Sequence, residues 1–262
     1  MSQPKVVSLP ESQKWLVDGF CWYTKRMVAK QFMSFGVQAE LLEASEVHEQ
    51  TPIIAYANHP SWWDPIVAML LQRAYFSNRT FYAPIDADAL EKYRIMAKLG
   101  FYGVRMESLD GASAFLSTTK AILRQKNVTV WITPEGRFSD VRDHCMPLMP
   151  GLSHLALKMP GVKFLPVAFE YGFWNESRPQ IFARFGSPIG SSESMSKADW
   201  NDLLTERLRA TQTELARSVQ SRDPSAFQYL VASRPIRLGL YDYCRGWAAW
   251  MSGKRFDPRH SV

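Results

Sequence analysis

Short apolar segments alternate with longer amphipathic segments along most of this chain. From residue 37 onward, short runs rich in apolar residues, typical of buried strands, are separated by stretches with apolar residues three or four positions apart, typical of helices. The predicted strands are 37–42, 52–57, 80–84, 102–105, 128–133, 162–170 and 180–185. The predicted helices are 65–73, 87–99, 111–125, 151–158 and 198–219. This alternation predicts an α/β fold with a mixed, mostly parallel central sheet flanked by helices.

Both ends of the chain have the pattern of amphipathic helices rich in aromatic residues. Residues from about 11 to 35 indicate one helix, which Gly19 could interrupt and Gly36 would end. Its apolar stripe is Leu16, Phe20, Tyr23 and Met27, and a second stripe after Pro235 is Ile236, Leu240, Tyr243, Trp247 and Trp250. We therefore expect three parts: an N-terminal amphipathic helical segment (1–36), an α/β domain (37–233) and a basic aromatic C-terminal helix (234–262).

The positive charge of the chain is concentrated at these two ends. The formal net charge is +6, of which residues 14–36 contribute +3 and residues 234–262 contribute +4, while 37–233 carry −1. A near-neutral centre does not suit a nucleic-acid groove, whereas basic ends with tryptophan and tyrosine suit contact with an anionic membrane surface. The alternative for each terminal helix is packing onto the α/β domain.

The cysteine positions and the lengths of the apolar runs narrow the class of protein. The three cysteines, Cys21, Cys145 and Cys244, are far apart and show no metal-ligand spacing, which fits a reducing compartment and excludes a disulfide framework or zinc site. The first ten residues lack the apolar core of a secretory signal, and no apolar run approaches the length of a membrane span. We expect a peripheral protein on the cytoplasmic face of a membrane.

The stretch 58–65, Asn-His-Pro-Ser-Trp-Trp-Asp-Pro, directly follows the predicted strand 52–57. A histidine delivered by the end of a buried strand, with an aspartate five residues later, is the pattern of a general base and the carboxylate that orients it. Pro60 disfavours a helical conformation at His59, so Asp64 in the first turn of the next helix can reach back to the imidazole. The alternative is that Asp64 only caps a helix beginning at Pro65.

Polar residues follow three of the predicted strands. They are Asn58 and His59 after the second strand, Arg105 at the end of the fourth, and Glu135, Gly136 and Arg137 after the fifth. Because open α/β sheets bind ligands at the carboxyl ends of their strands, we expect these residues to meet at one rim. Guanidinium groups suit phosphate, and a glycine lets the backbone approach a ligand closely. Taken singly, each arginine is better explained by surface pairing with a carboxylate, and only their convergence favours binding.

These segments resemble the sequence blocks of the glycerolipid acyltransferases, the family of 1-acylglycerol-phosphate acyltransferases. Residues 58–65 resemble the first block, 134–137 (Pro-Glu-Gly-Arg) the third, and 164–168 (Phe-Leu-Pro-Val-Ala) the fourth, while 100–105 resemble a shortened second block. They occur in the family's order over residues 53–170. Arg137 follows Gly136 without an intervening residue, as in bacterial 2-acylglycerophosphoethanolamine acyltransferases, so an acceptor without a terminal phosphomonoester stays open.

The resemblance implies direct acyl transfer, without a metal or bound cofactor, from acyl-CoA or acyl carrier protein to the hydroxyl of a lysophospholipid or related glycerolipid. His59 would accept the proton of that hydroxyl, and Asp64 would orient His59. Glu135 would position the acceptor, and Arg105 and Arg137 would hold its anionic headgroup.

The substrate side of the site is expected to include two further residues of the first block, Asn58 and Ser61. Backbone N–H groups near Ser61 or Gly136 would stabilise the tetrahedral oxyanion. Two alternatives remain: the same chemistry on an aminolipid or glycolipid acceptor, and a non-catalytic lipid-binding adaptor at the membrane. An adaptor has no need of His59, Asp64 and Glu135 together. The absence of a G-x-S-x-G turn argues against a serine hydrolase.

Overall fold

The computed structural model describes residues 9–45, 50–105, 108–190, 195–232, 247 and 249–252. The strands are β1 Phe35–Gln38, β2 Ile53–Ala57, β3 Thr80–Asp86, β4 Phe101–Val104, β5 Val128–Ile132, β6 Lys163–Gly172, β7 Gln180–Phe185 and β8 Gln228–Val231. The helices are α1 Lys14–Gln31, α2 Glu40–Glu43, α3 Asp64–Tyr75, α4 Ala87–Lys92, α5 Leu109–Leu123, α6 Gly151–Lys158 and α7 Lys197–Ser221, with the 3-10 helices η1 Arg94–Leu99 and η2 Pro224–Ala226.

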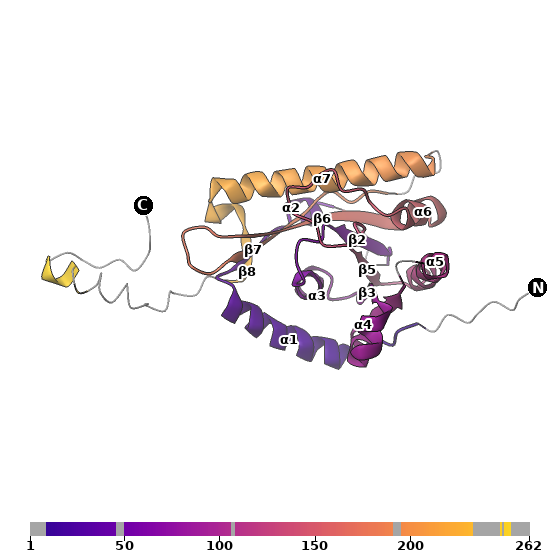
Figure 1. Ribbon diagram of the computed structural model, residues 1–262, viewed down its shortest axis with the longest axis horizontal. Helices are drawn as coiled ribbons and strands as arrows, with labels where there is room; N and C mark the ends of the chain where they lie inside the picture. The colour runs from indigo at the N-terminus through magenta and orange to yellow at the C-terminus, as the bar shows by residue number, and fades with distance from the viewer. Residues whose placement is uncertain are drawn as a thin grey trace, which may run out of the picture.

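The strands form one eight-stranded sheet in the order β4-β3-β5-β2-β6-β7-β1-β8, between two layers of helices (Figure 1). From β4 to β6 every neighbouring pair is parallel, so the carboxyl ends of these five strands lie at the same edge. β7 is antiparallel to β6 and parallel to β1, and β8 is antiparallel to β1. The predicted α/β fold with a mixed, mostly parallel sheet is confirmed.

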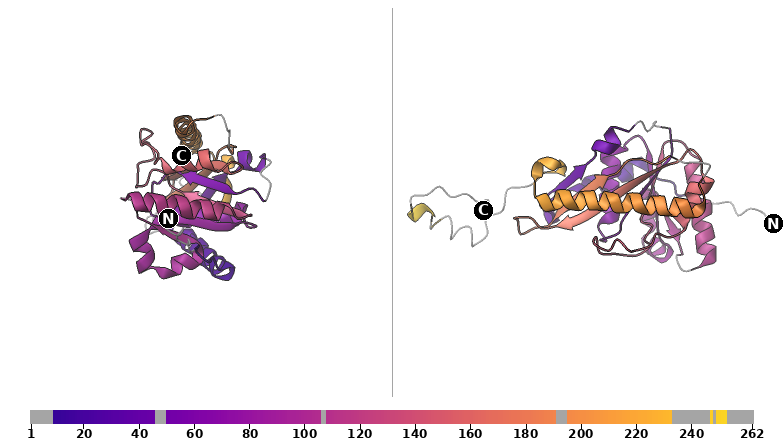
Figure 2. Two further views of the ribbon diagram at one scale, coloured as in Figure 1. Left: turned by 90° about the vertical axis from the view of Figure 1, so that its right-hand side faces the viewer. Right: turned by 90° about the horizontal axis from the view of Figure 1, so that it is seen from above.

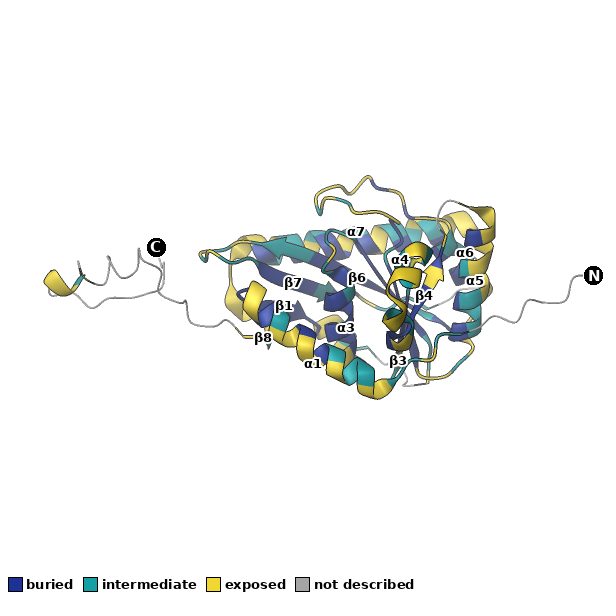
Figure 3. Cartoon of the chain, turned by 60° about the horizontal axis from the view of Figure 1, so that its bottom comes forward, coloured by how far each residue is buried: buried dark blue, intermediate teal, exposed yellow. Residues whose placement is uncertain are grey.

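Both faces of the sheet are buried, and the strand period of two divides the core between them. In β2, Ile53, Ala55 and Ala57 pack with the cluster under α1 and α3, while Ile54 and Tyr56 pack with the cluster under α5, α6 and α7. The end-on view in Figure 2 shows the two helix layers on either side of the sheet, and Figure 3 shows the buried strands between them. This two-sided burial explains why the strands are continuous apolar runs.

The longest helix, α7, begins where its sequence predicts. Ser196 accepts a hydrogen bond from the Asp199 N–H, and the Asp199 carboxylate accepts one from the Ser196 N–H, which makes a capping box. Leu204, Leu208 and Leu215 then face the sheet and are buried. The helix runs over one face of the sheet, as Figure 2 shows from above.

Some element boundaries differ from the sequence-based prediction. Gly19 does not break α1, because a glycine at an exposed position costs a helix only about 1 kcal/mol. Gly36 lies inside β1, where it pairs with Phe182, rather than ending the helix. Residues 40–42, predicted as strand, belong to the short helix α2. β8 was not predicted, because this edge strand has only one fully buried residue, Val231.

α1 packs against the domain along one face and leaves an aromatic face exposed. Cys21 and Val28 are buried, and Asp18 pairs with Arg73 of α3. Trp15 and Trp22 are 72% and 60% exposed on the outer face. Among the described residues, none of the helices has the length and apolarity needed to cross a membrane.

The predicted C-terminal helix is described only at residues 247 and 249–252, of which 247 and 249–251 are helical. Ile236, Leu240 and Tyr243, which carry most of its predicted apolar stripe, lie outside the described residues.

Candidate active site

His59 and Asp64 are in direct contact at the carboxyl end of β2. Nδ1 of His59 lies 2.6 Å from Oδ2 of Asp64. Asp64 is the first residue of α3, and its carboxylate turns back toward the loop, where Oδ2 also accepts the Ser61 N–H at 3.0 Å. The predicted contact therefore forms, and the carboxylate has a role beyond helix capping.

The two side chains differ in their access to solvent. The Asp64 side chain is 2% exposed, whereas that of His59 is 19% exposed. Burial raises the pKa of Asp64, and the hydrogen bonds from His59, Tyr171 and the Ser61 N–H act in the opposite direction. A proton on Nδ1 directed at the Asp64 carboxylate would leave the second ring nitrogen, Nε2, with a lone pair that can accept a proton. Phe138, 60% exposed, lies beside the imidazole with ring centroids 4.4 Å apart.

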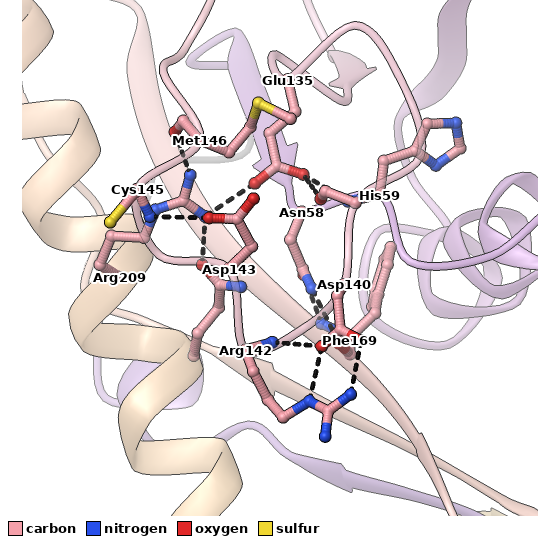
Figure 4. Close-up of polar contacts among 12 residues, drawn as sticks. Asn58, His59, Glu135, Asp140, Arg142, Asp143, Cys145, Met146, Phe169 and Arg209 are labelled. Atoms are coloured by element: carbon pink, nitrogen blue, oxygen red, sulfur yellow. Dashed lines mark hydrogen bonds and ion pairs between the residues drawn. The ribbon is translucent and has the colours of Figure 1, made fainter.

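Glu135 lies in the loop after β5 and contacts the main chain of the base rather than its ring. Its Oε2 accepts the His59 N–H at 3.1 Å and the Ser139 hydroxyl. Its Oε1 pairs with Nη1 of Arg209 at 2.7 Å, and Arg209 also donates to the Met146 carbonyl. Figure 4 shows the His59 ring directed away from the Glu135 carboxylate. Because the Glu135 side chain is 0% exposed, these contacts favour a role in holding the loop that carries His59 in place. Contact of Glu135 with the acceptor stays a prediction.

Asn58 fixes β2 to its neighbour at the same rim. Its amide nitrogen donates to the Phe169 carbonyl at 2.9 Å, and its amide oxygen accepts the Phe169 N–H at 2.8 Å (Figure 4). Asn58 is 1% exposed, and its two hydrogen bonds join the end of β2 to β6 beside the site.

The N–H groups of Ser61 and Gly136 both have partners in this structure. The Ser61 N–H donates to Asp64, and the Gly136 N–H donates to the Thr133 carbonyl at 3.1 Å. Gly136 has φ of 69°, a left-handed conformation that favours glycine and turns the chain sharply after β5. The Ser61 hydroxyl accepts the Trp63 N–H at 3.2 Å. Stabilisation of an oxyanion by other backbone N–H groups near Ser61 and Gly136 stays a prediction.

The predicted arginines lie at the same edge of the sheet as His59 but not beside each other. Both are exposed, Arg105 just after β4 and Arg137 in the loop after β5. Nη2 of Arg137 lies 3.4 Å from the sulfur of Met146. β4 is separated from β2 by β3 and β5, roughly 14 Å in all. Arg137 is therefore the nearer guanidinium, because β5 adjoins β2 directly.

Two residues that contact the site escaped the sequence reasoning. Tyr171 donates its hydroxyl to Oδ1 of Asp64 at 2.7 Å, and Arg209 of α7 holds Glu135. A signal for Tyr171 was its place near the end of a strand that is parallel to β2. Arg209 could have been found from its position directly after Leu208, because Leu208 belongs to the buried stripe of α7. Within the described ranges, no three His, Cys, Asp or Glu side chains gather as a metal site would require.

Comparison with known proteins agrees with this arrangement. The family model for acyltransferases matches residues 38–170, about half of the chain, and the chain belongs to the acyltransferase family. The fold is similar to the crystal structure of the 1-acyl-sn-glycerophosphate (LPA) acyltransferase PlsC from Thermotoga maritima. That similarity has a TM-score of 0.51 at 17% sequence identity and covers 78% of this chain and 80% of that chain. A comparison with curated proteins finds no match.

Proposed function

We propose that this protein transfers a fatty acyl group from an acyl thioester to the hydroxyl of a lysophospholipid or related glycerolipid. The observation that carries the proposal is the 2.6 Å contact between His59 Nδ1 and the buried Asp64 carboxylate, at the carboxyl edge of the sheet in a chain of the acyltransferase family. The lipid acceptor is supported by the structural similarity to PlsC, a 1-acyl-sn-glycerophosphate acyltransferase.

In this mechanism His59 is the general base and Asp64 orients it. Nε2 accepts the hydroxyl proton as the acceptor oxygen attacks the thioester carbonyl, which forms the new C–O bond. When the tetrahedral intermediate collapses, the C–S bond breaks and the thiolate takes the proton from the imidazolium, which restores His59. A positioned base of this kind contributes roughly 10²–10⁴-fold to the rate. No metal or bound cofactor takes part, and the donor is acyl-CoA or acyl carrier protein.

The acceptor headgroup would lie along the rim between β2 and β4. Arg137 follows the left-handed turn at Gly136 and would meet the part of the headgroup nearer the base. Arg105, three strands from β2, would meet a more distant anionic group. Both side chains are exposed and so are able to approach a ligand. An acceptor with a phosphodiester or another anionic headgroup fits this spacing as well as a phosphomonoester does.

The outer face of α1 supports a position on the membrane surface. Trp15, Trp22 and Tyr23 are exposed there, and the Arg26 guanidinium carbon lies 3.5 Å from the centroid of the Trp22 ring. Exposed tryptophan and tyrosine beside cations suit the headgroup layer of an anionic bilayer. We propose a peripheral position on the cytoplasmic face, where α1 would bring lipid acceptors to the site.

The function is tested by incubating purified protein with labelled acyl-CoA or acyl carrier protein and a panel of lysophospholipid, aminolipid and glycolipid acceptors. Transfer to a lysophospholipid supports the proposal, and preference for an aminolipid or glycolipid reassigns the acceptor. No transfer to any acceptor, together with tight liposome binding, would instead indicate a non-catalytic lipid-binding adaptor.

A further inference from the structure

Tyr171, near the end of β6, completes the hydrogen bonding of the buried Asp64 carboxylate. Oδ2 of Asp64 receives His59 Nδ1 at 2.6 Å and the Ser61 N–H at 3.0 Å. Oδ1 receives the Tyr171 hydroxyl at 2.7 Å. Each carboxylate oxygen thus has a donor, and β6 is tied to the segment that carries the base.

The position of the Tyr171 ring is fixed by the end of α1. Phe32, which follows the last residue of α1 and is 4% exposed, lies with its ring centroid 6.0 Å from that of Tyr171. Phe32 also meets Trp63 edge to face at 4.9 Å. Burial and the neighbouring Asp64 carboxylate raise the pKa of Tyr171 well above its ordinary value, so the hydroxyl keeps its proton and acts as a donor.

We propose that Tyr171 is a positioning residue for acyl transfer: its hydroxyl holds the Asp64 carboxylate ionised and aligned, so that the proton stays on His59 Nδ1 and Nε2 is free to act as the base. This inference rests on the proposed function. Tyr171 acts through Asp64 and His59 and needs no contact with the substrate.

The physical reason is the competition for one proton between His59 and the buried Asp64 carboxylate. The titratable groups that contact Asp64 within the described residues are His59 and Tyr171. Burial already biases Asp64 toward its protonated form, and the Tyr171 hydroxyl opposes that bias. Without the hydroxyl, the Asp64 pKa rises further. A protonated Asp64 would donate to Nδ1 and place the imidazole proton on Nε2, where it blocks base catalysis.

The test is Tyr171→Phe, which removes the hydroxyl and keeps the ring against Phe32. Because a hydrogen bond to a charged group is lost, we expect kcat to fall at least about 10-fold with KM nearly unchanged. The acid limb of the pH–rate profile should move to higher pH. Tyr102→Phe is the matched control, because its hydroxyl makes a similar 2.8 Å bond to Thr119, and its ring packs on the other face of the sheet from Tyr171.

A second readout needs no substrate. The proton between His59 Nδ1 and Asp64 should give a downfield proton NMR signal in the wild type that is absent from His59→Ala. As the solution is acidified, the chemical shift of this signal should change at a higher pH in Tyr171→Phe than in the wild type. Wild-type kinetics and an unchanged NMR titration in Tyr171→Phe, or an equal effect in Tyr102→Phe, would overturn the inference. If the wild type transfers acyl groups to no acceptor, the proposed function fails, and the NMR titration alone decides the role of Tyr171.

Discussion

Arg209 of α7 pairs with Glu135 of the loop after β5, with 2.7 Å between Nη1 and Oε1. The side chains are 11% and 0% exposed, so the pair is almost completely removed from water. The other oxygen of Glu135 accepts the His59 N–H. One buried carboxylate therefore joins the longest helix to the main chain of the proposed base.

This relationship predicts a large loss of stability for Arg209→Met. The substitution keeps an apolar stem of similar length but leaves the Glu135 carboxylate buried without its cation, which costs about 3–5 kcal/mol in the free energy of unfolding. Urea unfolding followed by circular dichroism measures this loss. Adding Glu135→Gln to the variant should restore part of the stability, because the remaining side chain is neutral.

The matched control is Arg217→Met on the same helix. Arg217 pairs with Glu214, but their side chains are 68% and 50% exposed, so its loss should change stability by no more than about 0.5 kcal/mol. Equal effects of Arg209→Met and Arg217→Met would show that the buried pair does not hold the loop.

The buried Asp64 carboxylate predicts that removing its charge maintains or raises thermal stability but lowers the rate of acyl transfer. Its pKa is raised from its ordinary value, so above the folded-state pKa the native protein buries an anion at a cost, and this cost falls as pH drops below that pKa until it vanishes below the pKa of the unfolded chain. Asp64→Asn, which is neutral at every pH, should therefore unfold at the same or a higher temperature than the wild type at pH 8. This advantage should shrink as pH falls through the folded-state pKa.

Asp64→Asn should at the same time lose roughly 10²-fold or more of the transfer rate, because the imidazole is no longer held in the basic tautomer. Thermal unfolding at a series of pH values, beside the transfer assay, tests both halves. A variant that is less stable at pH 8 by an amount independent of pH would show that the ionised carboxylate is not the destabilising group.

Membrane contact through α1 predicts that Trp15→Ala/Trp22→Ala weakens sedimentation with anionic liposomes. Both rings are exposed, so the folded domain should unfold at an unchanged temperature. Leu157→Ala serves as the control, because this exposed apolar residue lies on α6 in the opposite helix layer. Liposome binding that is unchanged in the double variant would remove α1 from the membrane contact.

Most of the fold was predictable because the sheet is buried on both faces. In β2 and β5 every residue is buried, so the apolar runs mark the strands directly. The contact between His59 and Asp64 was also predictable, since it depends on residues five apart and on the conformational limits that Pro60 imposes. Edge strand β8 has mixed polarity and carried no comparable signal.

The contacts that support His59 and Asp64 could not be predicted from the sequence in the same way. Tyr171 meets Asp64 only because β6 lies next to β2, and Arg209 meets Glu135 only because α7 crosses the sheet above the loop after β5. These contacts span 107 and 74 residues, and no local pattern fixes such pairings. Residues assigned to the substrate from sequence, Asn58 among them, instead make internal hydrogen bonds.

The central claim is that His59 is the base of an acyl transfer, and the most direct measurement is single-turnover transfer by His59→Ala. The imidazole is partly exposed, so the variant should keep the wild-type circular dichroism spectrum and bind liposomes normally. Transfer of a labelled acyl group to the preferred acceptor should fall by about 10²–10⁴-fold. Transfer at the wild-type rate by this folded variant would contradict the account.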